Sequence, residues 1–327
     1  MSADAGRRIL ITGAYGFVGL HLAAQLREMF GSGAVLGLTS ITAETHPAFG
    51  AFEALDVTDE TAVASAIARF QPTHVVHLAG LAVVAAASAN PALAWRVHLF
   101  GTLNVANAIL AYAPHCVLLS VGSGQVYGTS ARAGRLLDEN VVLAPGNGYE
   151  VTKAAADLAV GALTGQGLRS VRLRPFNHTG PGQTEQFVLP SFGMQIARIE
   201  AGLQAPVVRV GNLEAERDFL DVRDVTRAYG LAIAKSDELP PGIVLNIASG
   251  QPRSIRALLD QLLGMARVPI TVEADPARIR PSDTPRFVGE SALAQRLLGW
   301  RPAYSIEQTL ASVLDDCRER IASAHSR

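Results

Sequence analysis

Short apolar runs alternate with helical segments through the first half of the chain. The unbroken runs lie at residues 8–12, 34–38, 74–79, 116–121 and 170–174. Apolar residues that recur every three or four positions mark helices at 17–29, 61–70, 93–111 and 149–163. Strands that are apolar on both faces and alternate with helices are typical of a parallel sheet covered on both sides. The pattern predicts an α/β fold with a doubly wound parallel (Rossmann) sheet.

The regular alternation ends after residue 174, where Pro and Gly become frequent. For the second half we expect strands at 207–211 and 243–248 and helices at 222–235, 254–265 and 306–321. These elements predict a smaller mixed α/β lobe after the sheet. Val75 to Trp95 carries no charge, but Asn90-Pro91 interrupts it. We therefore expect a buried strand plus loop there and no membrane span.

The composition excludes several classes of protein. The chain has 327 residues, of which 49% are hydrophobic and 17% charged, and 28 Lys and Arg residues balance 29 Asp and Glu residues. The hydrophobic content excludes a disordered chain, and the near-zero net charge argues against nucleic-acid binding. The two cysteines, Cys116 and Cys317, lie far apart and form no cluster with His at metal-ligand spacing. We expect a cytoplasmic protein without a metal site.

Three glycines stand where the first strand is followed by the first helix, in the segment Thr12 to Gly19. Gly13 permits a tight turn, Gly16 lets the backbone approach a pyrophosphate, and Gly19 permits close packing of helix on strand. The N-terminus of the helix supplies N–H donors to the anion. The context predicts a dinucleotide site. Its expected residues in this segment are Gly13, Tyr15, Gly16, Phe17 and Val18.

The residues that follow the second strand favour NADPH as the cofactor. An acidic residue at this place would hold the adenosine 2′-hydroxyl of NAD, but the chain has Thr39 and Ser40, whose hydroxyls can bond a 2′-phosphate. No Arg lies between residues 36 and 68 to clamp that phosphate, so use of NADH is also open. Asp56, followed by Val57, can accept a hydrogen bond from the adenine amino group or can cap a turn or helix.

Ser123, Tyr149 and Lys153 form a candidate catalytic set. Ser123 follows the strand at 116–121, at the sheet edge where open α/β sheets bind ligands. Tyr149 and Lys153 are four residues apart and share one face of a helix. We expect Ser123 to polarise a carbonyl group and Tyr149 to donate a proton to the developing alkoxide. We expect the ammonium of Lys153 to lower the pKa of that phenol.

With these motifs, the chain resembles the extended short-chain dehydrogenase/reductase family of nucleotide-sugar enzymes over almost its whole length. The further matching segments are Asn90-Pro91, 101–104, 126–128, 174–182, 217–219, 246–250 and 299–302. Within that family, residues 174–182, 210–213 and 280–283 resemble the branch that acts on GDP-mannose derivatives. That branch contains a 4,6-dehydratase and the 4-ketoreductase that follows it.

One position separates the two activities of the branch. Its dehydratases carry Asp-Glu after the catalytic Ser or Thr, whereas this chain has Ser123-Gly124-Gln125. Neither Gly nor Gln can act as a general acid or base, so elimination of water is disfavoured. The resemblance thus implies reduction of GDP-4-keto-6-deoxy-D-mannose to GDP-D-rhamnose. A nucleotide-sugar 4-epimerase, a reductase that forms GDP-6-deoxy-D-talose, and a non-catalytic NADP(H)-dependent sensor stay as alternatives.

The resemblance also implies roles for residues that the motifs alone do not single out. The cofactor would contact Leu78, Ala79, Gly80, Lys153, Phe176 and His178. The GDP-linked substrate would contact Asn177, Val188, Arg217, Arg280 and Asp283, with the two arginines on its pyrophosphate. Residues 1–175, joined by 218–248, would form the NADP(H)-binding Rossmann domain, and residues 176–327 the sugar-nucleotide lobe. We expect a homodimer that pairs the helices at 93–111 and 149–163 across a twofold axis.

Three polar residues inside helical segments need a separate interpretation. His98 stands in the helix at 93–111 where many relatives have Asn, and it can serve as a hydrogen-bond donor or simply pack. Asp221 and Asp224 stand at the start of the helix at 222–235. We interpret both carboxylates as helix-capping groups.

Overall fold

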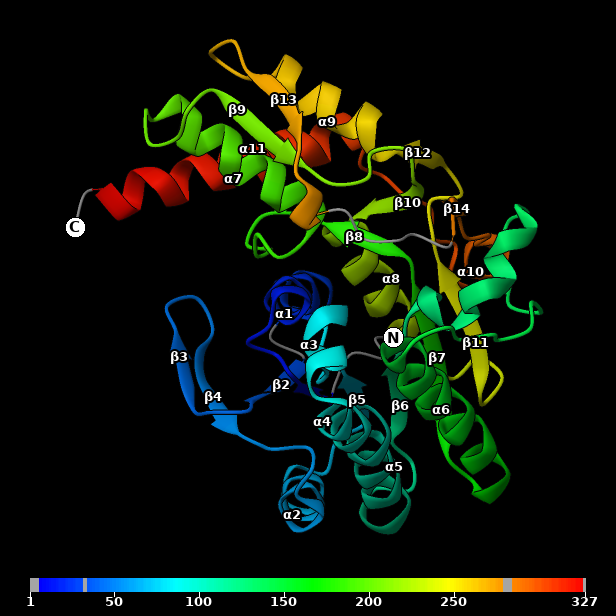
Figure 1. The fold of residues 1–327 in the computed structure, drawn as a ribbon. Helices are drawn as coiled ribbons and strands as arrows, with labels where there is room; N and C mark the ends of the chain where they lie inside the picture. Colours follow the sequence, from blue (N-terminus) through cyan, green and yellow to red (C-terminus); the bar gives the residue numbers. More distant parts are fainter. Residues whose placement is uncertain (1–5, 32–33, 279–283, 326–327) are drawn as a thin grey trace.

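A parallel sheet forms the centre of the N-terminal part of the molecule (Figure 1). The computed structural model describes residues 6–31, 34–278 and 284–325. Its largest sheet has eight strands in the order β11-β7-β6-β5-β1-β2-β4-β3. The parallel strands on which the site depends are β1 (Arg7–Thr12), β2 (Ala34–Ser40), β5 (His74–His77), β6 (Val117–Val121), β7 (Arg169–Pro175) and β11 (Ile243–Ile247). The predicted doubly wound α/β fold is confirmed.

Helices cover both faces of this sheet because its strands are apolar on both sides. Ile9 and Ile11 of β1 are buried on the face that α1 (Phe17–Phe30) and α8 (Val222–Ala234) cover. Leu10 lies on the opposite face. The helices that pack there are α2 (Glu60–Phe70), α5 (Gly101–Tyr112) and α6 (Gly148–Leu163). Alternate residues of β1 thus enter two separate hydrophobic cores.

The helical segment that runs past the site contains a π turn. α4 (Pro91–Trp95), a π-helical turn (Arg96–Phe100) and α5 follow one another without a break. Asn90 caps the start by accepting a hydrogen bond from the Leu93 N–H at 3.0 Å. Just before it, α3 (Val84–Ala89) lies where the sequence predicted only a loop. This stretch is rich in alanine, which has the highest helix propensity, so it forms a short helix instead.

A hairpin extends the large sheet beyond β2, and the sequence pattern did not predict it. β3 (Glu44–His46) and β4 (Gly50–Ala54) pair antiparallel, and β4 joins β2 in parallel. Within these two strands only the Phe52 side chain is buried. The segment therefore has no apolar run that would mark a strand.

The C-terminal part forms a smaller mixed lobe, above the large sheet in Figure 1. One small sheet contains β8 (Asn177–Thr179), β10 (Glu216–Asp221), β12 (Pro252–Ser254) and β14 (Arg286–Phe287), and another pairs β9 (Val207–Val210) with β13 (Thr271–Ala274). The helices that share a core with β9 and β10 are α7 (Val188–Glu200), α9 (Ile255–Gly264) and α11 (Ile306–His325). α10 (Ala292–Leu298) packs in the core of the large sheet instead. In the part of the chain that the structure describes, no helix is both long and apolar enough to cross a membrane.

Asp221 and Asp224 hold different parts of this lobe. Asp221 is the N-cap of α8, as predicted, and accepts a hydrogen bond from the Arg223 N–H at 2.8 Å. The buried carboxylate of Asp224 accepts instead from the backbone N–H groups of Ala303 and Tyr304, at 2.9 and 3.0 Å. The capping interpretation of Asp224 is wrong, because this carboxylate satisfies the loop before α11 and not the start of its own helix.

Candidate active site

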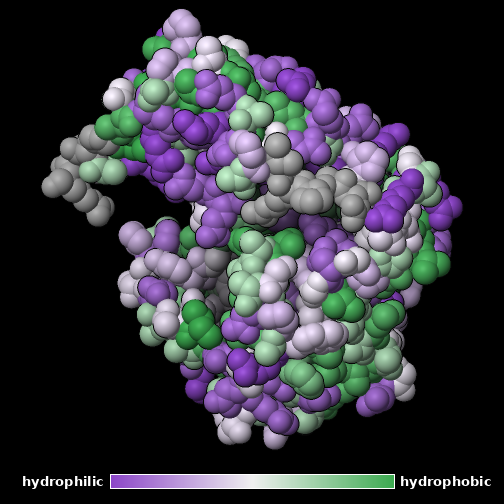
Figure 2. Space-filling view, viewed as in Figure 1, coloured by the Kyte–Doolittle hydropathy of each residue, from purple (hydrophilic) through white to green (hydrophobic). Residues whose placement is uncertain are grey.

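A cavity of about 1270 Å³ lies between the carboxyl ends of the large sheet and the C-terminal lobe. Figure 2 shows the molecule hollowed between these two parts. Gly13 and Ser123 line the cavity from the sheet side, and Asn177 and Arg217 line it from the other lobe. The cavity therefore uses the edge at which open α/β sheets bind their ligands.

The turn between β1 and α1 has no side chain that would block a pyrophosphate. Gly13 has a φ of 67°, and a Cβ there would lie 2.9 Å from the Ala79 backbone. A Cβ at Gly19 would lie 2.4 Å from the Ala14 carbonyl oxygen, so helix and strand pack too closely for any side chain. Gly16, the N-cap of α1, brings no side chain to the first N–H groups of the helix, so the turn fits an anion. The cavity lining here also contains Tyr15, Gly16, Phe17 and Val18.

Ser40 lines the cavity at the end of β2, but Thr39 is not among the lining residues. The buried Thr39 hydroxyl donates to the Ile11 carbonyl oxygen at 3.1 Å. Asp56 and Val57 also line the cavity. Through Oδ1, Asp56 accepts hydrogen bonds from both the N–H and the hydroxyl of Thr58, each at 2.9 Å. Asp56 thus forms a turn and stands at the cavity wall, so both interpretations of this residue stay open.

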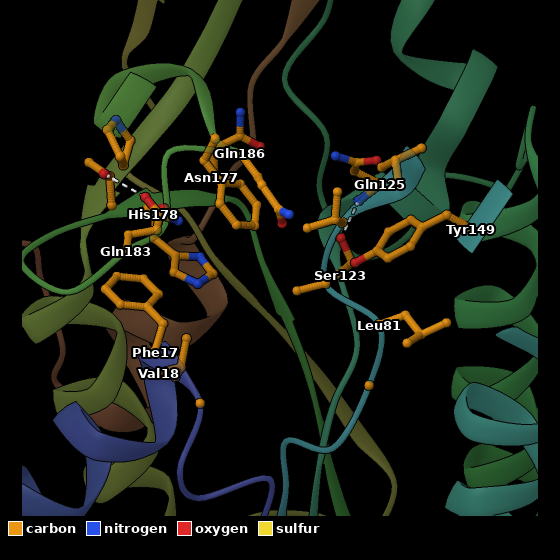
Figure 3. A pocket seen from close by; sticks show the side chains of 18 of the residues that line it. Phe17, Val18, Leu81, Ser123, Gln125, Tyr149, Asn177, His178, Gln183 and Gln186 are labelled. Atoms are coloured by element: carbon orange, nitrogen blue, oxygen red, sulfur yellow. Dashed lines mark hydrogen bonds between the residues drawn. The ribbon is translucent and has the colours of Figure 1, made fainter. Parts of the chain in front are cut away.

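The three candidate catalytic residues come together at the end of β6. Ser123 follows that strand, and its hydroxyl bonds the hydroxyl of Tyr149 on α6. Figure 3 shows these two side chains pointing toward each other, with Gln125 beside them. The Lys153 ammonium donates to the Val121 carbonyl oxygen at 3.4 Å. Its Nζ lies 3.2 Å from the place where a Cβ on Gly80 would be, so Lys153 borders the loop that follows β5.

Burial shifts the pKa values of the two ionisable groups in opposite directions. It raises the pKa of Tyr149, and the hydrogen bond from Ser123 only partly offsets this rise. Burial lowers the pKa of Lys153 from 10.5 to about 8. The expectation that Lys153 lowers the phenol pKa is wrong for this structure, because desolvation of the phenolate dominates. A raised phenol pKa keeps Tyr149 protonated near neutral pH, which is the form that a proton donor needs.

The loop after β5 and the strand β8 supply the other residues expected at the cofactor. Leu78, Ala79, Gly80, Phe176 and His178 all line the cavity. The His178 ring stacks on Phe17, with 6.3 Å between the ring centroids. Its Nδ1 lies 2.9 Å from the Phe176 carbonyl oxygen and must donate to it, because a carbonyl oxygen can only accept. Burial lowers the pKa of His178, so the ring is neutral and Nε2 is left as an acceptor.

Of the residues expected at the substrate, Asn177, Val188 and Arg217 line the cavity. Arg217 donates to the Glu216 carbonyl oxygen at 2.7 Å, and burial lowers its pKa. Arg280 and Asp283 lie outside the described residues.

Sequence reasoning missed two cationic residues of the cavity lining, Arg209 and Arg278. Arg209 is the exposed residue between buried Val208 and Val210 in β9. The alternation of apolar and polar residues along that strand could therefore have predicted that the Arg209 side chain points away from the core. Arg278 donates to the Ser191 hydroxyl at 3.2 Å.

Amide side chains line the cavity on both sides of the catalytic set. In Figure 3, Gln125 stands beside Ser123, while Asn177 and Gln186 lie on the opposite side of the cavity. The acidic residues of the described lining are Asp56, which holds its own turn, and Glu185, which is paired with Arg198 at 2.8 Å.

A buried polar network fixes the helix that carries Tyr149 and Lys153. Asp157 of α6 binds Arg174 of β7 through two hydrogen bonds, at 2.8 and 3.0 Å. Arg174 also donates to the Tyr127 hydroxyl at 3.0 Å, and Tyr127 donates to Asn246 of β11 at 2.8 Å. Tyr127, Arg174 and Asn246 belong to the segments on which the resemblance was based, and their contacts explain them as supports of the site.

Comparison with known proteins gives consistent results over both lobes. A family model described as GDP-mannose 4,6 dehydratase matches residues 10–313. GDP-6-deoxy-D-mannose reductase of Pseudomonas aeruginosa is 35% identical over 316 residues, which cover 96% of this chain and 98% of the relative.

Two solved structures extend this likeness to three dimensions. RMD from Pseudomonas aeruginosa complexed with NADPH has a TM-score of 0.84 at 34% identity, with coverage of 96% of this chain and 100% of that chain. The UDP-glucose 4-epimerase of Thermus thermophilus in complex with NAD has a TM-score of 0.82 at 27% identity, with coverage of 95% and 99%.

The family match begins in β1 and ends in α11, so it takes in the glycine turn, the set of Ser123, Tyr149 and Lys153, and the C-terminal lobe. The resemblance stated from the sequence is confirmed. This chain belongs to the GDP-mannose 4,6 dehydratase family, within the NAD(P)-dependent short-chain dehydrogenases/reductases.

Proposed function

We propose that this protein reduces the C4 ketone of GDP-4-keto-6-deoxy-D-mannose with NADPH and forms GDP-D-rhamnose. One observation carries the proposal: Ser123 and Tyr149 meet at the cavity wall with the amide Gln125 beside them, and Lys153 lies behind them at the end of β6. A catalytic Ser that is followed by Gly and Gln, with no acid or base of its own beside it in the described lining of the cavity, suits carbonyl reduction and does not suit elimination of water. The likeness to the Pseudomonas aeruginosa reductase supports the same reaction.

In the proposed reaction, bound NADPH supplies a hydride to the ketone carbon. Ser123 donates a hydrogen bond to the ketone oxygen and polarises the carbonyl group. Tyr149 gives its phenol proton to the same oxygen as negative charge develops there. The Lys153 ammonium stabilises the phenolate that Tyr149 becomes.

The cofactor would lie along the sheet edge. Its diphosphate would bind the N–H groups at the start of α1, in the turn that Gly13 and Gly16 leave open. The Ser40 hydroxyl would contact the 2′-phosphate, and the absence of an acidic side chain there would let NADPH bind with NADH as a second cofactor. The remaining residues that we assign to the cofactor are Tyr15, Phe17, Val18, Asp56, Val57, Leu78, Ala79, Gly80, Lys153, Phe176 and His178; Thr39 is no longer among them, because its hydroxyl is bonded to Ile11.

The sugar nucleotide would enter from the C-terminal lobe. We assign Asn177, Val188 and Arg217 to it, together with Arg280 and Asp283 by family resemblance. The additional cations Arg209 and Arg278 line the same end of the cavity and favour an anionic ligand. In this proposal, residues 1–175 with 218–248 bind the cofactor and residues 176–327 bind the sugar nucleotide.

We also propose that the protein is a homodimer. Large apolar side chains are exposed on the helical segment 91–112 and on α6, namely Trp95, Phe100, Tyr112, Val151 and Leu158. Figure 2 shows hydrophobic residues gathered at the lower right, where Figure 1 places α6. Pairing these two helical segments across a twofold axis would cover the exposed residues.

The buried free thiols of Cys116 and Cys317 are compatible with a reducing, cytoplasmic setting.

The test is to follow NADPH absorbance while the purified protein is mixed with GDP-4-keto-6-deoxy-D-mannose, with GDP-mannose as the control. We expect oxidation of NADPH only with the keto sugar, because GDP-mannose has no ketone to reduce. Protein that retains NAD through purification and shows no net oxidation would instead be a 4-epimerase. Binding of NADPH without any turnover would favour the non-catalytic sensor.

A further inference from the structure

A chain of buried hydrogen bonds links the cofactor turn to the catalytic helix through two histidines, His77 and His98. His77 lies at the end of β5, and His98 lies in the π turn before α5. Both side chains are buried, and the reaction proposed above uses neither. π turns are rare in proteins, and those that do occur are often found at functional sites. The contacts of His98 in this turn are therefore relevant to the site.

The partners of His98 define which ring nitrogen carries the proton. The Leu81 N–H donates to His98 Nε2 at 3.0 Å, so Nε2 has no proton. Nδ1 lies 2.8 Å from the Thr152 hydroxyl oxygen. That hydroxyl donates its own proton to the carbonyl oxygens of Gly148 or Tyr149, at 3.0 and 2.9 Å. Nδ1 must therefore be the donor to Thr152, and the ring is neutral with its proton on Nδ1.

The same reasoning defines the proton on His77. The Thr102 hydroxyl donates to the His98 carbonyl oxygen at 2.6 Å, so it must accept from His77 Nε2 at 3.1 Å. His77 Nδ1 then accepts from the Thr12 hydroxyl at 2.7 Å. Thr12 directly precedes Gly13 of the cofactor turn and accepts from the Ala79 N–H at 3.3 Å. The chain of bonds thus runs from the cofactor turn to the backbone of His98.

The charge state agrees with this geometry. Burial, reinforced by the nearby Lys153 ammonium, lowers the pKa of both imidazoles to about 3. A second proton on His98 would face the Leu81 N–H and break that bond. Neutral rings also leave the Lys153 ammonium without a positive neighbour to repel it.

His98 packs against Tyr149 and against the loop that borders Lys153. Its ring meets the Tyr149 ring edge to face, with 5.5 Å between the centroids. A Cβ on Gly80 would lie 3.2 Å from Lys153 Nζ and 3.5 Å from His98 Cδ2, so this loop, the lysine and the histidine pack together. Leu81 also packs on the apolar cluster that contains Tyr149.

We propose that His98 is a positioning residue, which locks the Gly80–Leu81 loop to the catalytic helix α6 through Thr152. The lock holds Tyr149 and Lys153 at a fixed distance from the loop that borders the cofactor. An Asn at this position would have a donor and an acceptor on a shorter side chain. His can reach both the Leu81 N–H and the Thr152 hydroxyl, and so joins two elements at once.

Two measurements test the lock without reference to turnover. In protein with isotopically labelled histidine, the imidazole nitrogen shifts of His98 should report a proton on Nδ1 that does not titrate between about pH 5 and pH 9. The Leu81 amide should exchange its hydrogen at least about 10-fold faster in His98→Leu than in the unchanged protein. A proton on Nε2, titration in that range, or unchanged Leu81 exchange in a folded His98→Leu protein would overturn the proposal.

The kinetic test rests on the proposed ketone reduction. We expect His98→Leu and Thr152→Val each to lower kcat about 10-fold through misplacement of the reacting groups, with little change in KM for the sugar nucleotide. The double variant should be no worse than either single variant. His98→Gln, which has a donor and an acceptor on a longer side chain than Asn, should recover more of the rate than His98→Asn.

The matched control is Thr226→Val, which removes a buried threonine hydroxyl of α8 that donates to the Arg223 carbonyl oxygen, and it should leave kcat unchanged. Additive losses in the double variant, or a kcat of His98→Leu within about twofold of the unchanged protein, would contradict the lock. If the unchanged protein reduces no keto sugar, the proposed function fails, and the nitrogen shifts and the Leu81 exchange still decide the role of His98.

Discussion

Tyr149 and Lys153 must both be protonated for the proposed reduction. The phenol must carry its proton, and the raised pKa of Tyr149 ensures this. The ammonium must be charged to stabilise the phenolate that forms, but burial brings the pKa of Lys153 down to about 8. Burial therefore favours the donor and at the same time limits the pH range in which its partner is charged.

The first prediction concerns the proton donor. Tyr149→Phe removes the phenol proton but keeps the ring that packs against Ala87 and Ala94. We expect kcat to fall by about 10³-fold, which is within the usual range for loss of a general acid. The NADPH dissociation constant, measured by fluorescence titration, should stay within about twofold, because the ring and its packing are kept. Near-normal turnover would show that another group gives the proton.

The second prediction concerns pH. The Lys153 ammonium is present below a pKa of about 8 and is lost as the pH rises through that value. The rate constant kcat/KM should therefore decline above about pH 8, while Tyr149, whose pKa is raised, is still protonated. In Lys153→Arg the decline should move to higher pH, because a guanidinium keeps its charge. An unchanged profile in that variant would assign the decline to a different group.

At the scale of elements, the site depends on helices that are fixed by buried charges. α6 is held by Asp157 and Arg174, the start of α8 is held by Asp221, and Asp224 of α8 holds the loop before α11. In each case a buried carboxylate accepts several hydrogen bonds, so it is satisfied without solvent. Such networks place Tyr149 and the C-terminal lobe but do no chemistry themselves.

The third prediction tests one of these carboxylates. Asp224→Ala leaves the N–H groups of Ala303 and Tyr304 without their acceptor and removes the ion-pair partner of Arg227. We expect a loss of about 2–4 kcal/mol in the free energy of unfolding, measured with denaturant. Glu214→Ala is the control, because Glu214 and its partner Arg256 are both exposed and the variant should unfold almost as the unchanged protein does. Equal midpoints for the two variants would contradict the role given to Asp224.

The sequence pattern predicted the large sheet well and the small lobe poorly. Strands such as β1, β6 and β7 are buried on both sides, so they are visible as apolar runs. The hairpin of β3 and β4 buries only Phe52, and β14 has two residues, so neither leaves a periodic signal. Pairing of these short strands depends on tertiary contacts rather than on local sequence.

Some residues of the candidate site could be predicted from the sequence, and some properties of the site could not. Gly13, Ser123 and Tyr149 were found from the sequence because each sits at a recognisable place next to a strand or helix. The raised phenol pKa and the bonds of His98 could not be found, since both depend on burial and on residues far apart in the chain. The sequence predicted both Thr39 and Ser40 at the cofactor, but the Thr39 hydroxyl donates to the Ile11 carbonyl oxygen. Of the two residues, Ser40 alone lines the cavity, because neighbouring residues of a strand point to opposite sides.

For the whole molecule, near-neutral charge conceals a local imbalance. The formal net charge is −1, yet the part of the cavity that the C-terminal lobe lines contains Arg209, Arg217 and Arg278. A small anion with a diphosphate needs only a few well-placed cations, so the overall balance carries no information about it. The two lobes therefore contribute different chemistry to one cavity.

The fourth prediction concerns assembly. Leu158 is exposed on α6, and an Arg at this position would place a charge in the proposed interface of the homodimer. We expect the unchanged protein to have the mass of two chains in light scattering coupled to gel filtration, and Leu158→Arg the mass of one chain. Leu203→Arg is the control, because Leu203 is equally apolar and exposed but lies in the turn after α7. Two-chain mass for Leu158→Arg would place any dimer contact elsewhere.

The configuration of the product tests the central claim most directly. NMR of the sugar nucleotide formed from GDP-4-keto-6-deoxy-D-mannose, with NADPH and separately with NADH, reports both whether the C4 ketone is reduced and which face receives the hydride. We predict GDP-D-rhamnose with both cofactors and faster formation with NADPH. GDP-6-deoxy-D-talose as the product, or a ketone that stays unreduced, would contradict the account.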